Sequence, residues 1–276
     1  MSARLISRYA DDPRVVTAIV ATLVAGVLWL ATWRHMAGMD MMAGMDMGST
    51  MGASGMGGMD MSMGMMAPGD WSAGTVTATI AMWVLMMAAM MLPSMAPIMA
   101  IYAGIAGKED RGLRLALRIF LFTLGYFLLW AAFSVVGALG QLGLRSSEWF
   151  SMGGTLAGPY AAAVLLIVAG AYQFTPIKEF CLRHCRHPLT YLMSHWREGM
   201  SGAFPVGARH GLYCLGCCIA LMGLMFVFGA MNVVWMAAIA VYFLAEKVLP
   251  RVEIWGRITG GLLILAGLIT LVRAVV

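Results

Sequence analysis

Long apolar runs separated by short polar segments dominate the hydrophobic pattern of the chain. A helix needs about 20 predominantly apolar residues to cross about 30 Å of hydrocarbon. The runs occupy residues 15–33, 74–102, 115–139, 160–174, 206–230, 233–245 and 254–275. The fourth and sixth runs are short, so we expect their helices to extend further or to cross a thinner bilayer. This pattern predicts an all-α fold, a polytopic membrane bundle of about seven transmembrane helices.

The composition agrees with a membrane protein. Of the 276 residues, 61% are apolar and 11% are charged, and the mean hydropathy is +0.84. Soluble domains are about 45–50% apolar and about 25% charged. These values exclude an ordinary soluble domain, and the expected partner is the lipid bilayer. The net charge of +5 is better explained by loop residues that set the orientation than by nucleic acid, which we do not expect as a partner.

The basic residues predict how the chain is oriented. With a cytoplasmic N-terminus, 15 of the 18 Lys and Arg residues fall in cytoplasmic segments, and the outer side holds only Arg34, Arg145 and Arg273. Because Lys and Arg concentrate in cytoplasmic loops, this distribution predicts an N-in/C-out topology. The first run follows three arginines, as a secretory signal does. It lacks a clear cleavage site, so we expect an uncleaved anchor.

The same pattern divides the chain into three parts. Residues 1–34 would form a cytoplasmic N-terminus and the first membrane helix. Residues 35–70 would form a disordered, Met- and Gly-rich periplasmic segment, because their composition cannot build a core. Residues 71–276 would form a six-helix membrane domain with a cytoplasmic Cys/His loop at 175–209.

The predicted outer segment is unusually rich in methionine. It holds 13 of the 28 Met residues, and the unit Met-Asp-Met occurs at 39–41, 45–47 and 59–61. Thioethers are soft, uncharged donors that bind Cu(I) or Ag(I) and largely ignore harder cations. A flexible spacer with incidental methionines is the alternative. The ligands that we expect in this segment are His35, Met39, Met41, Met45 and Met47.

The second apolar run continues the thioether pattern within a helix. Its letters MWVLMMAAMMLPSMAPIM contain two rows of Met spaced four residues apart, and such residues stack on one helical face. Pro93 and Pro97 predict a kink. Methionine is also an adaptable filler of helix cores, which is the alternative explanation. The metal ligands expected on this helix are Met82, Met86, Met90, Met91 and Met95.

The loop after the fourth run contains the first of two Cys/His clusters. Its letters CLRHCRH include Cys181, His184 and Cys185, which share one face if the helix continues. The order CxxHC differs from the haem-attachment pattern CxxCH. These residues could accept copper on the cytoplasmic side. A tetrahedral zinc site with His187 or His195 as the fourth ligand is the alternative.

The fifth run carries the second cluster on one helical face. At about 100° per residue, His210, Cys214, Cys217 and Cys218 fall within an arc of about 100°, and Met225 continues it. Ligand-type residues inside a membrane are functional candidates by default, although cysteine also packs as a small apolar residue. Thiols select Cu(I) or Zn(II), and the neighbouring thioethers favour Cu(I). The compartments predict free cysteines rather than disulfides.

Other features suggest packing roles. We expect Asn232, Glu246 and Lys247 to cap helices or to hydrogen-bond between them. The stretch 189–196 has apolar residues at helical spacing and predicts an interfacial helix on the cytoplasmic surface.

Three strings carry a resemblance to a known family: AMMLPSMAPI, CLRHCRHPLTYLMSHWREG and GARHGLYCLGCCIALMGLMFVFGAMN. Over residues 75–250 the chain resembles a bacterial family of predicted metal-binding integral membrane proteins (domain of unknown function 2182). The resemblance implies metal binding and a membrane location, but no defined reaction. In chemistry alone, the Met-rich segment and the Met ladder are also similar to eukaryotic high-affinity copper transporters, which are three-span subunits.

These observations favour a multi-pass protein of the bacterial inner (cytoplasmic) membrane that captures Cu(I) and transfers it or takes it up. Its partners would be a periplasmic or cytoplasmic copper chaperone and further copies of the same chain. One alternative is a membrane-embedded metalloenzyme or redox protein with a copper or zinc centre, although no catalytic residue is assigned. Another is an assembly factor stapled by Zn(II).

Overall fold

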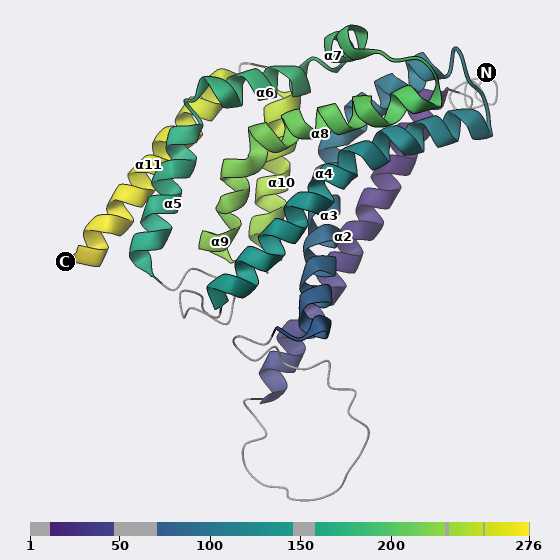
Figure 1. Cartoon of the computed structure of the whole chain (residues 1–276). Helices are drawn as coiled ribbons and strands as arrows, with labels where there is room; N and C mark the ends of the chain where they lie inside the picture. Colours follow the sequence, from purple (N-terminus) through teal and green to yellow (C-terminus); the bar gives the residue numbers. More distant parts are fainter. Residues whose placement is uncertain (1–11, 47–70, 146–157, 230–231, 251, 276) are drawn as a thin grey trace, which may run out of the picture.

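The computed structural model describes residues 12–46, 71–145, 158–229, 232–250 and 252–275 (Figure 1). The described residues form helices and no strand, which confirms the expected all-α fold. The helices are α2 (Pro13–Asp46), α3 (Ala73–Ala106), α4 (Leu113–Arg145), α5 (Pro159–Tyr172), α6 (Pro176–Arg186), α7 (Pro188–His195), α8 (Gly199–Gly223), α9 (Met225–Phe228), α10 (Val233–Val248) and α11 (Val252–Val275).

Five stretches within the described residues are long and apolar enough to cross a membrane: α2, α3, α4, α8 joined with α9, and α11. The pair α5 and α6 passes the same test together but is bent by 63°, and would make a sixth. Helix α10, the expected sixth span, has 16 residues and a length of about 24 Å. The prediction of about seven spans is therefore reduced to five or six by helix length and apolarity.

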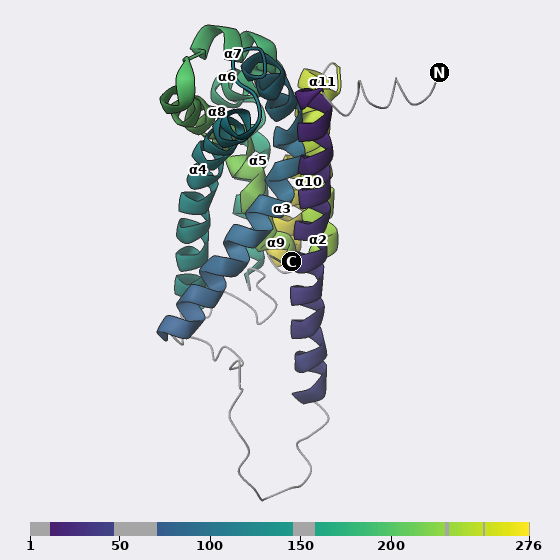
Figure 2. The same cartoon turned by 90° about the vertical axis from the view of Figure 1, so that its right-hand side faces the viewer.

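The bend between α5 and α6 has a local cause. The Thr175 side chain accepts a hydrogen bond from the Lys178 backbone N–H at 3.3 Å, and Pro176 occupies the first position of α6. Both features begin a new helix. As a result α6 and then α7 lie across one end of the bundle (Figures 1 and 2). Helix α7 forms where an interfacial helix was predicted.

The first helix is longer than expected. Helix α2 continues past Arg34 to Asp46, so the start of the Met-rich segment is helical, and our prediction of disorder from residue 35 is wrong for this part. Methionine and alanine are good helix formers, and an existing helix extends at little cost. Only the backbone of this extension is described. Of the ligands expected in the Met-rich segment, four lie on the extension and one lies outside the described residues: His35, Met39, Met41 and Met45 on the helix, and Met47 beyond it.

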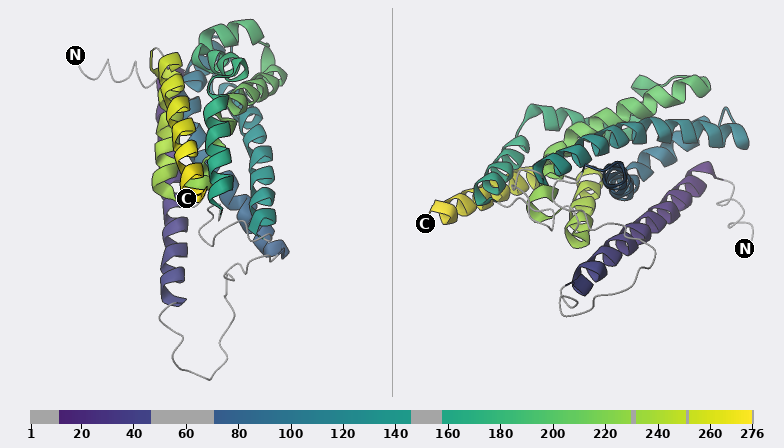
Figure 3. Two further views of the ribbon diagram at one scale, coloured as in Figure 1. Left: turned by 90° about the vertical axis from the view of Figure 1, so that its left-hand side faces the viewer. Right: turned by 60° about the horizontal axis from the view of Figure 1, so that its bottom comes forward.

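Helix α3 occupies the centre of the bundle, in contact with α2, α4, α7 and α10. Helices α2 and α11 lie at its margins and expose many large apolar side chains (Figure 3), as lipid contact would require. The start of α2 and the end of α11 lie at opposite ends of the bundle (Figure 1). This arrangement agrees with termini on opposite sides of a membrane.

Small residues bring α4 and α8 close together. A Cβ atom added at Gly125 would lie 2.8 Å from the Ala208 backbone nitrogen, and one added at Gly211 would lie 3.1 Å from the Tyr126 carbonyl oxygen. Glycines allow membrane helices to approach in this way. The approach places Tyr126 beside the face of α8 that carries the cysteines.

Candidate metal centre

Helix α8 gathers three thiols in the interior of the protein. The Sγ atoms of Cys214, Cys217 and Cys218 all lie within 4.8 Å of one another, and these residues are no more than 1% exposed. The predicted arc on this helix therefore corresponds to a buried cluster. His210, one turn before Cys214, is also buried at 2% exposure, and its Nδ1 has no hydrogen-bond partner among the described residues.

The spacing of the thiols suits a metal ion. Metal–sulfur bonds of about 2.3 Å place two sulfur ligands of one ion no more than about 4.6 Å apart. The Sγ atoms of Cys217 and Cys218 are 3.4 Å apart, so small side-chain movements would bring all three onto one ion. A buried group of soft donors is the type of site that binds Cu(I) or Zn(II).

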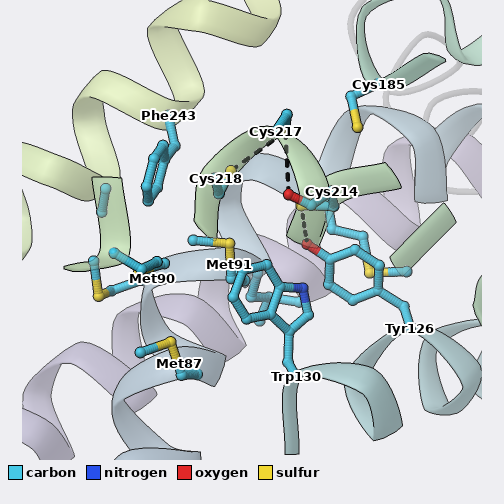
Figure 4. Packing of buried hydrophobic residues seen from close by; sticks show 14 of the residues in the cluster. Met87, Met90, Met91, Tyr126, Trp130, Cys185, Cys214, Cys217, Cys218 and Phe243 are labelled. Atoms are coloured by element: carbon cyan, nitrogen blue, oxygen red, sulfur yellow. Dashed lines mark hydrogen bonds between the residues drawn. The ribbon is translucent and has the colours of Figure 1, made fainter. Parts of the chain in front are cut away.

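Cys185 of α6 lies beside this cluster. Its side chain is buried, and its thiol is close enough to Cys214 and Cys217 to interact with them electrostatically. We expected Cys181, His184 and Cys185 to form a separate acceptor site, and the structure divides them. Helix α6 packs across α8, and Figure 4 draws Cys185 to one side of the thiols of α8. The three-thiol cluster of α8 therefore has a further buried thiol beside it, from a second helix.

The other two members of the expected loop site lie beside the cluster. The Sγ of Cys181 packs against Gly216, where an added Cβ would lie 2.6 Å from the sulfur. The ring of His184 stacks on Tyr213 with a centroid distance of 4.2 Å. His187, considered as a fourth ligand of a zinc site, is exposed where α6 ends and α7 begins. None of these three belongs to the thiol cluster.

Two polar groups from other helices bind Cys214. The Lys247 Nζ of α10 donates a hydrogen bond to Cys214 Sγ at 3.1 Å, and the Tyr126 hydroxyl of α4 lies 3.0 Å from the same sulfur. An ammonium group has donors only, so the sulfur accepts. The positive charge of Lys247 would offset the negative charge that metal-binding thiolates carry.

The sequence reasoning did not connect these two residues with the cluster. It predicted that Lys247 would cap a helix or hydrogen-bond between helices, and the side chain does join α10 to α3 and α8. Asn232 caps α10, through hydrogen bonds from the Val234 and Trp235 backbone N–H groups. Glu246 does join helices, since it forms a buried ion pair with Lys178 of α6. An ionisable side chain at the end of an apolar helix was the available signal for Lys247; Tyr126 gave none.

The thioethers of α3 lie in the same core as the thiols. All five expected ligands on this helix are buried, and Figure 4 shows three thioethers of α3 near the cysteines. One chain of contacts joins the two helices, because Lys247 also donates to Ser94 Oγ at 2.9 Å, and Ser94 Oγ lies 4.0 Å from Met91 Sδ. Met225 is buried at the start of α9. The ladder residues are Met82, Met86, Met90, Met91 and Met95.

Comparison with known proteins adds a family. Residues 80–270 match the sequence model of the family PpoB2, described as a copper chaperone. The match covers more than half of the chain and includes every cysteine and the residues of α3 discussed above. Like the metal-binding family that the sequence resembles, this family has a role with a metal, and its description names copper. No curated protein and no solved structure matches the chain.

Proposed function

The chain belongs to the PpoB2 copper chaperone family, and from that premise we propose that it holds Cu(I) at the thiol cluster of α8 and transfers it to an acceptor. The observation that carries the proposal is the buried cluster itself, in which three thiols of α8 lie within 4.8 Å of one another and Cys185 of α6 lies beside them. Soft thiolates in a water-poor interior favour Cu(I) over harder cations.

The charge around the cluster suits a thiolate-bound metal ion. Two thiolates and one Cu(I) carry a single net negative charge, which the Lys247 ammonium beside Cys214 would neutralise. A buried charge without such a partner is costly.

We further propose that the protein spans the bacterial inner membrane with its N-terminus in the cytoplasm. The apolar helices and the distribution of basic residues support this orientation. In it, the Met-rich segment would capture Cu(I) from the periplasm and the α3 thioethers would offer weaker intermediate sites. The thiol cluster would then hold the ion until an acceptor, such as a soluble chaperone, removes it.

Metal analysis of purified protein tests the proposal. The variants are C214S/C217S/C218S, C181S as a matched control that keeps the cluster, and a deletion of residues 36–66. We expect about one copper per chain in the wild type and in C181S, and almost none in the triple variant. The deletion should slow loading from dilute Cu(I) without lowering the final copper content.

Two results would overturn the proposal. Copper content that is undiminished in the triple variant would remove the thiol cluster from the function. Zinc bound at about one per chain, in place of copper, would favour a structural role, because structural zinc sites are also built from cysteine thiolates.

A further inference from the structure

Three histidines, one each from α6, α7 and α8, take part in a row of aromatic rings that reaches from α6 and α7 toward the thiol cluster. His184 and His195 are half-buried, whereas His210 is buried one turn before Cys214. The row is built around two tyrosines. His184 stacks on Tyr213 at a centroid distance of 4.2 Å, and His195 stacks on Tyr191 at 4.8 Å.

Backbone contacts favour one tautomer of the two outer histidines. His184 Nδ1 lies 2.8 Å from the Phe180 carbonyl oxygen, and His195 Nδ1 lies 3.0 Å from the Tyr191 carbonyl oxygen and 2.9 Å from the Ser194 hydroxyl. A carbonyl oxygen only accepts hydrogen bonds, so these contacts favour a hydrogen on each Nδ1, with the Ser194 hydroxyl as a second acceptor. In the neutral rings, Nε2 therefore keeps its lone pair. This is the arrangement in which histidine binds a metal while a backbone oxygen fixes its ring.

The inner histidine connects this surface to the thiols. The His210 ring lies 5.2 Å from that of Tyr191 and 5.8 Å from that of Tyr126, measured between centroids. Tyr126 in turn contacts Cys214 Sγ. The buried Nδ1 of His210 has no partner among the described residues, which is costly unless a ligand uses it at some stage. Tyr191 is held in place by its hydroxyl, which donates to the Val206 carbonyl oxygen of α8 at 2.7 Å.

We propose that His184 and His195 form a metal port, with His210 as the relay between this port and the thiol cluster. The proposal rests on the proposed function, since it names the route by which Cu(I) leaves the cluster. Each step is a ligand exchange: a Cu–S bond breaks as a Cu–N bond to His210 forms, that bond breaks as a Cu–N bond at the port forms, and the port bond breaks as a Cu–S bond to the acceptor forms. The ion stays Cu(I), so no electron donor or acceptor is needed. The acceptor at the port is a molecule with soft donors, such as exposed thiols.

The port is tested by separating the rate of copper release from the amount bound. The protein is loaded with Cu(I) under anaerobic conditions, and release is followed by absorbance after mixing with a bulky, sulfonated Cu(I) chelator. The variant H184F/H195F keeps aromatic rings against both tyrosines, so it should preserve the packing. The matched control is H187F, which removes the exposed histidine of the same surface.

We expect release from H184F/H195F to slow by about tenfold or more, which is the size of effect that supporting metal-site residues have. Its final copper content should equal that of the wild type, and H187F should release copper at the wild-type rate. The single variants H184F and H195F should each show part of the effect, which guards against a folding defect in the double variant.

The outcomes distinguish the two proposals. An unchanged release rate in H184F/H195F, or equal slowing in H187F, overturns the port and leaves the thiol cluster as the copper site. Loss of bound copper from H184F/H195F would also overturn it, because the histidines would then be ligands of the cluster. A wild-type chain that holds no copper at its thiols overturns the proposed function and the port with it.

Discussion

Helices α3 and α8 both carry soft donors in the core, but they arrange them in different ways. On α3 the five Met residues of the ladder follow one another along the helix and are surrounded by apolar groups. On α8 the three cysteines fall within little more than one turn, contact one another and meet a cation from α10. Both helices are buried, so burial does not distinguish them.

The comparison shows that arrangement matters as much as donor type. Thioethers are neutral and remain neutral when a metal binds, so a spaced row of them offers several similar and weak sites. Thiolates are charged, and a cluster of them with a nearby ammonium offers one strong site. We therefore interpret α3 as a surface along which Cu(I) could move and α8 as the place where it stays.

The largest effect on Cu(I) binding is expected when the two cysteines of α6 are replaced one at a time. We expect C185S to weaken Cu(I) binding by up to about 100-fold, the upper end of what loss of a metal-site partner costs, because Cys185 lies beside Cys214 and Cys217. C181S should bind almost as the wild type does. Competition titration with a Cu(I) chelator measures both, and equal losses would show that Cys185 has no special role.

Copper removal should affect stability through α8. A ligand present at 100 times its dissociation constant stabilises the folded protein by about 2.7 kcal/mol. We expect Cu(I) to raise the melting temperature of the detergent-solubilised wild type, and a chelator to reverse the rise. C214S/C217S/C218S should show no such shift, although its Met ladder is intact. A shift of wild-type size in that variant would assign the stabilising site to the thioethers.

Variants of Lys247 test whether a positive charge is what distinguishes the thiol cluster of α8 from the Met ladder of α3. K247M keeps the length and apolar stem of the side chain but removes the ammonium that contacts Cys214 and Ser94. We expect Cu(I) affinity to fall by about tenfold, which is about 1.4 kcal/mol. K247R retains the charge and should recover most of the loss. If both variants bind alike, charge neutralisation is not what Lys247 contributes.

The smallest effect is expected on α3. Met91 is the thioether joined to the cluster through Ser94, yet M91L conserves volume and should change the free energy of unfolding by less than about 1.5 kcal/mol. Its equilibrium affinity for Cu(I) should match that of the wild type. An affinity loss as large as that of C185S would make Met91 a ligand of the cluster, and would remove the distinction between the helices.

Local patterns in the sequence predicted the helices and the face of α8. The apolar runs correspond to described helices, and the arc of His210 and three cysteines is buried together. Such predictions succeed because helical periodicity relates residues that are close in sequence, and the backbone alone places them. Where local signals were misjudged, as in the extension of α2 to Asp46, the error was in the bounds of an element.

The side chains that surround the thiols of α8 could not be predicted from local patterns. Cys185, Tyr126 and Lys247 come from three other helices, and their contacts with α8 depend on how those helices cross it. The bend before Pro176 turns α6 over α8, and a buried ion pair between Lys178 and Glu246 joins α6 to α10. No spacing along the chain encodes these contacts.

The sequence by itself therefore determined that this protein is helical, largely apolar and equipped with soft donors, because composition and periodicity are properties of short stretches. Only the tertiary structure decided that Cys185 lies beside the three thiols of α8, that a lysine contacts Cys214, and that His184 stacks on Tyr213. The physical reason is that glycines such as Gly211 allow helices to approach closely, and the closeness of that approach selects which distant side chains meet.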